Sequence, residues 1–462
     1  MIAPRVPFAL ELVHASLAFT SAAGLPPVNW SLPDTARVMA TMMADLKGPR
    51  ASHAYVLPAN AIGDMVDTMG VAQDLGALTV ADTDLDWAGF LPLYRDVLAV
   101  YDGRVAAIPT QGIMMQLYYR RDLLAAAGLP PPRTWSEVVS YAARFNGTDL
   151  NGDGVADDYG ICLWRATCDG LSNPLAAILA SLAQSKGRHT GFLFEPESMR
   201  PVWETPAWEA ALLLARNLTA YAAPVYTLPP TPLMPCFTQP LFTQGRCAMS
   251  LGLAGQFKSD SNPANPLSVV RGRVGSSVLP GSDTVLDWAR NAMVTCDPDT
   301  CPFATHYPST LASPAPASAA PPPAPAAAPP RRLHRRLAAH VRRHARSLTA
   351  ARAPPLPSPP PLWVNHVPYA ATGGQSIFIS RLQPEAQRLA TYTLVAQMVR
   401  DAGAWALVAG PGSEFGPTRT EQLGLDGVSY GHWAMYGYDP DDLAGFLGAA
   451  QVRVRGAGGV CV

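Results

Sequence analysis

Charged residues are scarce in this sequence. They make up 15% of its 462 residues, and the net charge is −1, which excludes a strong whole-protein attraction to nucleic acid or to anionic membranes. Arginine supplies nearly all of the positive charge, since Lys47, Lys186 and Lys258 are the only lysines. None of them follows a glycine-rich turn, so nucleotide hydrolysis by a phosphate-binding loop is excluded.

Long apolar runs are also missing. No uninterrupted run reaches the roughly 18 residues that a membrane-spanning helix needs. Residues 1–24 contain one basic residue, but Glu11 and His14 interrupt their apolar stretch, and no lipoprotein cysteine follows. We therefore predict that LELVHASLAFTS (10–21) is the first strand of the fold. A signal peptide is then expected upstream of this sequence, or the chain is part of a longer protein.

The seven cysteines do not show the spacing of a zinc site, because paired Cys-x-x-Cys knuckles and nearby histidine ligands are both missing. Six of them fall into close pairs, which predicts local disulfides and an oxidising compartment; the alternative is buried free thiols. The predicted pairs are Cys162–Cys168, Cys236–Cys247 and Cys296–Cys301, with Cys461 left over. Three glycosylation sequons, at Asn29, Asn146 and Asn217, agree with secretion.

What the sequence does contain is a regular alternation of helical and strand periods. Residues 35–46 have helical spacing, and HAYVL (53–57) is a short buried strand. MMQLYYRR (114–121) predicts a strand, and WSEVVSYAARF (135–145) a helix capped by Thr134. This alternation predicts an α/β fold of parallel sheets covered by helices on both faces.

One segment does not fit this pattern. Residues 312–361 are rich in proline, alanine and arginine and cannot bury enough apolar surface to fold, so we expect a disordered insertion. Its arginine-rich part (331–352) is either a solvated stretch or a cationic helix for an acidic partner.

Motifs of catalysis are weak. Gly427-Val428-Ser429-Tyr430-Gly431 has the pattern of a nucleophile elbow, but the last histidine is His432, so no catalytic histidine follows at the required distance. We also find no acid/base pair, metal set or supported nucleophile. The sequence therefore predicts a protein that is not an enzyme.

The loop DLNGDGVADD (149–158) resembles the first half of a calcium loop. Asp149, Asn151 and Asp153 place oxygens at alternate positions before Gly154, but the twelfth position is Gly160 instead of glutamate. One interpretation is a calcium site completed by Asp157 or Asp158, and the other is a polar turn. No other cofactor is expected.

Candidate ligand positions follow predicted strands. Trp164 comes directly after YGICL (159–163), where ligands bind in open α/β sheets, although a core tryptophan is an equal alternative. PYAATGGQSIFIS (368–380) contains Tyr369 and the pair Gly373-Gly374, which permits close backbone approach. These places must converge in space to form one site.

Several blocks together resemble the extracellular solute-binding proteins of ABC sugar importers, the family that includes maltodextrin-binding proteins. The blocks occur in the family's order: AAIPTQGIMMQLYYRRDLLAAAGLPPPRTWSEVV (106–139), FTQGRCAMSLG (242–252), SSVLPG (276–281), ATGGQSIFISRLQPEAQRLATYTLVAQM (371–398) and WAMYGYDPDDLAGFL (433–447). The resemblance covers residues from about 53 to 447, apart from the 312–361 insertion.

This resemblance implies a two-lobed fold, with hinge strands and a ligand cleft between the lobes. Residues 7–111 and 282–400 form the first lobe, and residues 113–281 and 401–450 form the second. Binding of a small solute, with a carbohydrate-like ligand favoured, shifts the lobes towards closure. The implied ligand positions are Phe19, Ser21, Asn60, Gln111, Trp164, Tyr369, Gly373, Gly374 and Gln375.

The sequence departs from the family at two positions. Phe257 stands near the place where sugar binders often carry tryptophan, and Ile113 occupies a hinge position that often carries an acid. The CDPDTCPFAT (296–305) and NHVPYAATGG (365–374) blocks are similar to solute-binding-like ectodomains of green algae, some attached to nucleotide cyclases. The resemblance thus implies an extracellular protein that serves a membrane permease or, alternatively, is the sensor module of a receptor.

Overall fold

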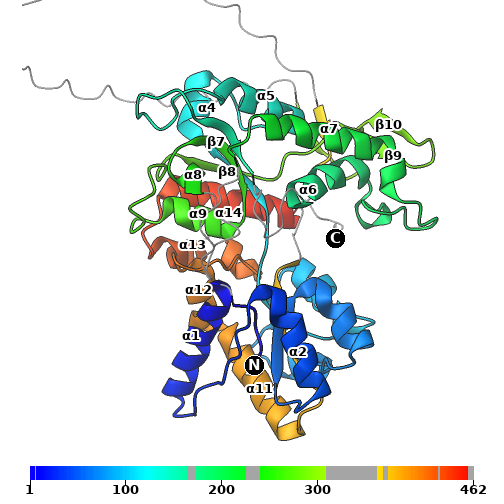
Figure 1. Cartoon of the computed structure of the whole chain (residues 1–462), viewed down its shortest axis with the longest axis vertical. Coiled ribbons are helices and arrows are strands. Elements are labelled where there is room, and N and C mark those ends of the chain that lie inside the picture. Colours follow the sequence, from blue (N-terminus) through cyan, green and yellow to red (C-terminus); the bar gives the residue numbers. More distant parts are fainter. Residues whose placement is uncertain are drawn as a thin grey trace, which may run out of the picture. The chain divides into compact units, whose positions relative to one another are not determined.

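The computed structural model describes residues 1–5, 7–163, 172–224, 240–308, 362–367, 373–424 and 427–455. The predicted insertion at 312–361 lies outside these residues. By its internal contacts the chain divides into a large unit, Met1–Thr305 with Trp363–Val462, and a small one, His306–Leu362. The large unit contains two sheets of three or more strands, with helices packed around them, an α/β architecture (Figure 1).

The first sheet contains β1 (Ala54–Pro58), β13 (Gln375–Ile379) and β4 (Ile108–Gln111), in that spatial order. β13 pairs antiparallel with both neighbours, so β1 and β4 point in the same direction on either side of it. All three strands are largely buried, and an isolated bridge from Ile2 to Tyr55 extends the sheet.

The second sheet has the order β6 (Tyr159–Cys162), β7 (Cys247–Gly252), β5 (Gln116–Arg120) and β8 (Val274–Ser277). Only the β6–β7 pair is parallel; β5 pairs antiparallel with β7 and with β8. The prediction of parallel sheets is therefore wrong. The alternation of helical and strand periods predicts where strands lie along the sequence but not the direction in which they pair. A strand that enters a sheet from a remote part of the chain, as β13 does, can pair antiparallel with its neighbours whatever those periods are.

The remaining strands are short. β2 (Val100–Tyr101) and β3 (Arg104–Val105) form a hairpin, as do β9 (Thr284–Asp287) and β10 (Ala292–Thr295), whereas β11 covers Thr305–Tyr307 and β12 Leu362–Val364. The β9–β10 hairpin contacts α6 and α7. Leu286 of β9 and Leu279, just before it, belong to the same apolar cluster as Leu117 of β5.

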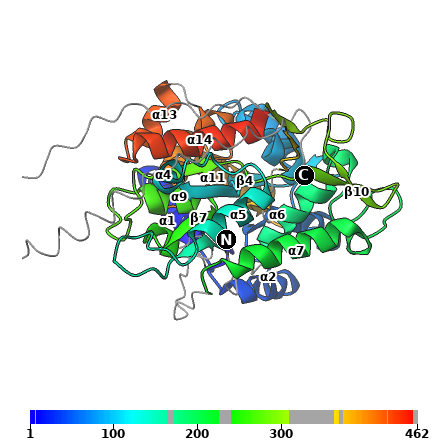
Figure 2. The ribbon, with the colours of Figure 1, turned by 90° about the horizontal axis from the view of Figure 1, so that it is seen from above.

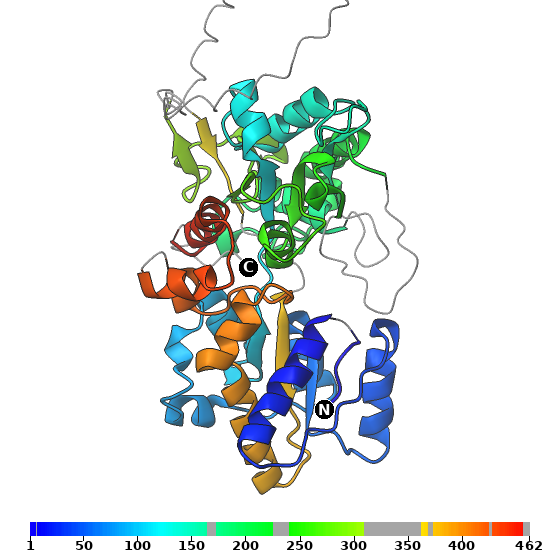
Figure 3. The same ribbon diagram turned by 90° about the vertical axis from the view of Figure 1, so that its left-hand side faces the viewer.

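The longest helices are those that cover the sheets. They are α1 (Pro7–Ala22), α2 (Val38–Lys47), α5 (Trp135–Phe145), α6 (Ser172–Ala183), α7 (Pro206–Ala220), α11 (Glu385–Met398) and α14 (Pro440–Arg455). The shorter ones are α3 (Gly76–Ala81), α4 (Arg121–Ala127), α8 (Pro240–Thr243), α9 (Ala254–Ser261), α12 (Asp401–Ala409) and α13 (Gly427–Ala434). Figure 3 shows α1 beside α11, and Figure 2 shows α13 beside α14.

Residues 10–21, predicted as a strand, belong to the helix α1 instead. The buried positions of this helix are Phe8, Ala9, Leu12, Ser16 and Thr20, which recur every three to four residues. That spacing is helical, and it was obscured because small hydroxyl residues replace apolar ones on the buried face. Ser16 and Thr20 satisfy their hydroxyl groups by donating to backbone carbonyls one turn earlier.

The helix α5 forms as predicted. The Thr134 hydroxyl accepts a hydrogen bond from the Glu137 backbone N–H (3.1 Å), and the Glu137 carboxylate accepts one from Thr134 N–H, a reciprocal capping box. Its apolar face is buried, and Trp135 donates from Nε1 to Ser181 Oγ of α6 at 3.1 Å. Gly160 of β6 passes so close that an added Cβ would lie 2.0 Å from the Ala142 carbonyl oxygen, so this strand position excludes larger residues.

One disulfide joins Cys162 of β6 to Cys247 of β7. The predicted pairs Cys162–Cys168 and Cys236–Cys247 are therefore wrong, because adjacent strands bring together residues 85 positions apart. Cys168, Cys236 and Cys461 lie outside the described residues.

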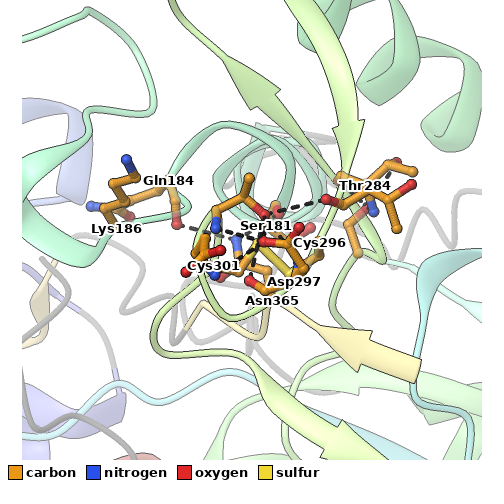
Figure 4. Close-up of a disulfide and its surroundings, with 12 residues drawn as sticks. Ser181, Gln184, Lys186, Thr284, Cys296, Asp297, Cys301 and Asn365 are labelled. Atoms are coloured by element: carbon orange, nitrogen blue, oxygen red, sulfur yellow. Dashed lines mark hydrogen bonds between the residues drawn. A yellow bond between two sulfur atoms is a disulfide. The ribbon is translucent and has the colours of Figure 1, made fainter. Parts of the chain in front are cut away.

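The predicted Cys296–Cys301 disulfide is confirmed. Figure 4 shows it next to Asn365, whose side-chain amide donates to the backbone carbonyls of Ser181 (2.8 Å) and Gln184 (3.1 Å). Those two bonds attach the chain after β12 to the end of α6.

Candidate functional site

Three strand ends of the first sheet meet at one edge. The carboxyl ends of β1 and β4 lie on either side of the amino end of β13, with Pro58 and Gln111 both paired to Gln375. Ala59 N–H donates to the Gly374 carbonyl at 3.0 Å, and the Thr110 hydroxyl donates to the Gln375 carbonyl at 3.0 Å. The fold thus brings three distant parts of the chain together at this edge.

The glycine pair before β13 makes the close approach possible. Gly373 and Gly374 have φ of 75° and 81°, in the left-handed region that glycine adopts without strain. A Cβ on Gly374 would lie 2.0 Å from the Gln111 carbonyl oxygen, so no other residue fits without moving the backbone. The expected close backbone approach is present, and the neighbour is Gln111, the last residue of β4.

A fourth segment, 410–419, crosses the same edge. Gly112 and Gly416 exchange backbone hydrogen bonds at 3.2 and 3.1 Å, and the Gln111 side-chain Nε2 donates to the Glu414 carbonyl at 3.2 Å. Phe415, next along the chain, is buried with its ring edge-on to Phe8 of α1. Glu414 therefore lies beside Gln111, although 303 positions separate them in the sequence.

Three buried oxygens at this place have no hydrogen-bond donor among the described residues. They are Gln111 Oε1, Gln375 Oε1 and Glu414 Oε2. The orientation of the Gln111 amide is fixed, because its Nε2 donates to a carbonyl, which only accepts. A buried acceptor without a donor costs about 1–3 kcal/mol, so these three oxygens are candidates for a donor supplied from outside the chain.

The cluster is next to a buried lysine. Lys258 of α9 is completely buried, donates from Nζ to the Phe415 carbonyl at 2.7 Å, and lies over the Trp433 ring with Nζ 5.9 Å from its centroid. Burial lowers the pKa of the Lys258 ammonium to about 7, against the opposite influence of Glu11 and Glu414. Burial likewise raises the pKa of Glu414 to about 7, while Lys258 lowers it. The two groups therefore carry reduced charge near neutral pH.

The structure brings together five of the predicted ligand positions. Gln111, Gly373, Gly374 and Gln375 form the edge, and Asn60 lies exposed in the short helix η2 (Ala59–Ala61) next to it. Trp164 and Tyr369 lie outside the described residues.

Phe19 and Ser21 lie on α1 and not on a loop after a strand. Ser21 is exposed, and Phe19 lines a separate cavity of about 670 Å³ together with Leu25 and Thr391. Among the described residues, no other predicted ligand position lines that cavity. The geometry does not link Phe19 or Ser21 to the edge of the first sheet. Their role as ligand positions stays a prediction.

The oxygens of the predicted calcium loop bind the protein itself. Asp149 accepts hydrogen bonds from the backbone N–H groups of Gly152 and Gly154, and Asn151 Nδ2 donates to Asp153. Asp157 and Asp158 bind Arg246 (2.8 and 2.9 Å). In the described part of the chain no group of three or more His, Cys, Asp or Glu side chains is arranged to hold a metal ion. Calcium binding at this loop stays a prediction.

Ser429, the centre of the Gly-x-Ser-x-Gly motif, lies within the helix α13 and is buried. A nucleophile elbow requires a sharp strand-to-helix turn, so this placement agrees with the rejection of hydrolysis on sequence grounds.

The sequence reasoning missed Glu414 and Lys258. Glu414 occurs in GPGSEFGPT (410–418), a run of turn residues that indicates only a loop. Lys258 had a signal, because it is one of three lysines and follows the FTQGRCAMSLG block, but a lysine on a helix is usually exposed.

Comparison with known families gives a match over just over half of the chain. Residues 54–294 match the model of the family described as bacterial extracellular solute-binding protein. Over 85 residues the chain is 40% identical to the mannitol-binding protein of Pseudomonas aeruginosa. That segment spans 18% of this chain and only 17% of the length of the relative.

Solved structures extend the likeness to nearly the whole chain. An ABC transporter solute-binding protein of Agrobacterium radiobacter K84 in complex with ribitol has a TM-score of 0.61 at 16% identity, covering 99% of this chain and 93% of that one. A solute-binding protein of Agrobacterium vitis S4 with bound D-mannitol has a TM-score of 0.55 at 17% identity, covering 96% and 82%. These likenesses confirm the predicted two-lobed α/β fold.

Proposed function

The chain belongs to the bacterial extracellular solute-binding protein family, and on that premise we propose that it captures a small polyhydroxylated solute, a sugar alcohol or a sugar. The binding place is the edge formed by Gln111, Gly374, Gln375 and Glu414. The observation that carries the proposal is the cluster of three buried acceptor oxygens, which have no donor among the described residues.

The chemistry of the cluster favours neutral hydroxyl groups. Each hydroxyl of a polyol donates one hydrogen bond, so neighbouring hydroxyls can satisfy neighbouring acceptors. An anionic solute is disfavoured, because it would face carbonyl oxygens and a carboxyl group. A cationic solute is also disfavoured, because it would need a fully ionised carboxylate at Glu414. Burial raises the pKa of Glu414 to about 7, and the Lys258 ammonium lies close by.

The relatives support the same class. The mannitol-binding protein is named for a sugar alcohol, and the two Agrobacterium structures contain ribitol and D-mannitol. Acyclic polyols bend to follow a row of acceptors, whereas a rigid ring presents its hydroxyl groups in fixed directions. Mannitol and ribitol are therefore the first ligands to test.

We place the hinge at the Gly112–Gly416 bridge, where the chain passes from β4 to β5. The proposed lobes keep the division expected from the sequence, residues 7–111 with 282–400 and residues 113–281 with 401–450. The β9–β10 hairpin is the exception: its contacts are to α6 and α7, so we assign it to move with the second lobe. A solute that binds both lobes favours the closed state.

The physiological partner in this proposal is a membrane permease, and the site of action is extracellular or periplasmic. No helix in the described part of the chain is both long and apolar enough to cross a membrane. A role as the sensor module of a receptor stays a prediction.

Isothermal titration calorimetry with mannitol, ribitol and maltose tests the proposal. We expect saturable binding of at least one of these, and an affinity about 3- to 10-fold lower in Gln375→Ala, because the variant loses one hydrogen bond to the solute. Glu414→Ala should weaken binding in the same direction. The matched control is Gln387→Ala, which removes an exposed glutamine from α11.

Two results would count against the proposal. One is the absence of binding by the folded protein at millimolar concentrations of every sugar and polyol. The other is binding that Gln387→Ala weakens as much as Gln375→Ala does, because that would place the ligand away from the acceptor cluster.

A further inference from the structure

A concave site lies at the other end of the first sheet from the proposed solute site. It is a pocket of about 430 Å³ lined by Gln73, Asp74, Arg104, Arg381 and Arg388, with small apolar residues between them. Gln375 begins β13, whereas Arg381 follows its end. At about 3.3 Å per residue these two positions are roughly 20 Å apart. The pocket is therefore separate from the proposed solute site.

Three arginines from three different segments line this pocket. Arg104 belongs to β3, Arg381 follows β13, and Arg388 is on α11. Arg104 forms an ion pair with Asp102 at 3.2 Å, and its guanidinium is 4.0 Å from Asp67. No carboxylate of the described residues lies within ion-pair distance of Arg381 or Arg388. Asp74 is the single acid among the described residues of the lining, and its Oδ1 accepts a hydrogen bond from the Gly76 backbone N–H at 2.9 Å.

Backbone contacts hold two of the guanidinium groups in place. Arg381 donates from Nε to the Gly70 carbonyl, and Arg388 donates from Nη1 to the Arg381 carbonyl at 3.3 Å. The loop beneath is fixed in turn, because Arg381 N–H donates to Val71 O and Gln73 N–H donates to Ile379 O. Each guanidinium carries five N–H donors, so several on each arginine remain for a ligand.

We propose that this pocket binds a small, multiply charged oxyanion, such as a molecule carrying phosphate groups. Anchored guanidinium groups present paired N–H donors in the geometry that phosphate and carboxylate oxygens accept. Arg381 and Arg388 have no carboxylate of the described residues within ion-pair distance, so their positive charges repel each other, and a bound anion of charge −2 or more offsets that repulsion. The volume exceeds that of a single inorganic phosphate, which favours an anion of small-molecule size.

This site has the opposite chemistry to the acceptor cluster. The arginine-lined pocket offers hydrogen-bond donors and positive charge, whereas the acceptor cluster offers hydrogen-bond acceptors and little charge. The chain would thus bind two different ligands independently, a neutral solute at one end of the sheet and an anion at the other.

The experiment is a calorimetric titration of the full chain with pyrophosphate at low ionic strength. We expect saturable binding that weakens as salt is added, since screening acts on partly exposed charges. Arg388→Gln should lower the affinity at least about tenfold, because it removes charge-assisted hydrogen bonds. Arg216→Gln, which removes an exposed arginine from α7, is the charge-matched control and should bind as the parent does.

A parallel titration with citrate distinguishes a preference for phosphate from one for carboxylate; either anion, if bound with this pattern, supports the site. If Arg388→Gln fails to fold, Arg104→Gln serves in its place, because that side chain is exposed and holds no backbone segment. The proposal is overturned if neither anion binds the parent, or if Arg216→Gln weakens binding as much as the pocket variants. Mannitol titration of Arg388→Gln should be unchanged, so this outcome is separable from the test of the solute site.

Discussion

Asp260 of α9 is the most unusual carboxyl group in the described part of the chain. Its side chain is completely buried and accepts hydrogen bonds from the Thr243 hydroxyl (2.7 Å) and from Gln256 Nε2 (2.8 and 2.9 Å). Burial raises the pKa of Asp260 to about 8, and nearby Asp442 acts in the same direction. The pKa of Asp442 is itself raised to about 6, mainly by burial. Loss of hydration exceeds the stabilisation that these hydrogen bonds provide.

These shifts predict how stability depends on pH. The folded state keeps protons on Asp260, Asp442 and Glu414 at pH values where the unfolded state has lost them, so stability falls as pH rises from about 5 to 7. Lys258 acts in the opposite direction only above about pH 7, where its lowered pKa lies. Each fully shifted carboxyl contributes a slope of about 1.4 kcal/mol per pH unit. Asp260→Asn should reduce the slope by about that amount, measured by urea unfolding at pH 5, 6 and 7. An unchanged slope would show that Asp260 is ionised in the folded state.

At the residue scale, the sequence predicts a functional side chain only where a local pattern marks it. The glycine pair at 373–374 and Gln111 at the end of a strand have such patterns, and the structure places them together. Glu414 has none, because its role depends on a segment that returns to Gln111 from 303 positions away. Its burial, and with it the raised pKa, comes from tertiary packing that no local pattern encodes.

At the scale of elements, α5 was predictable because several local signals agree. Thr134, Glu137 and the apolar spacing of residues 135–145 all define one helix. The α1 helix was not, because the buried Ser16 and Thr20 break the apolar period that the helix actually follows. Strand positions were likewise predictable from the sequence, whereas strand directions were not. In the first sheet they depend on β13, which enters from a remote segment, and in the second sheet β5 runs antiparallel to β7 and β8.

The capping box of α5 gives a prediction at this scale. Thr134→Ala removes the acceptor for the Glu137 backbone N–H, so the free energy of unfolding should fall by about 1 kcal/mol. Thr393→Ala is the control: this exposed threonine of α11 donates only within its own helix and should change stability by less than about 0.5 kcal/mol. Denaturant titrations of both variants make the comparison, and equal losses would contradict a capping role.

At the scale of the whole molecule, two sheets are joined by short crossings. The chain passes from β4 to β5 through Gly112, which pairs with Gly416 on the returning segment. A Cβ on Gly112 would lie 2.0 Å from the Pro417 carbonyl oxygen, so the two crossings are packed against each other. Local sequence patterns identify each glycine as a turn residue but not as the partner of the other. The order of the family-like sequence blocks along the chain did predict the fold. That order specifies the topology, which the local helical and strand periods do not.

The two described disulfides differ in how much of the chain each constrains. Cys162–Cys247 closes a loop with a sequence separation of 85, whereas Cys296–Cys301 closes one of 5. The loss of entropy that a disulfide imposes on the unfolded chain grows with the logarithm of loop length. By that relation, replacing Cys162 and Cys247 by alanine should lower stability by about 4–5 kcal/mol, and replacing Cys296 and Cys301 by about 2 kcal/mol. Guanidinium unfolding of the two double variants measures the difference. Equal losses would mean that the stabilisation arises in the folded state, from the packing of the buried cysteines, and not from the unfolded chain.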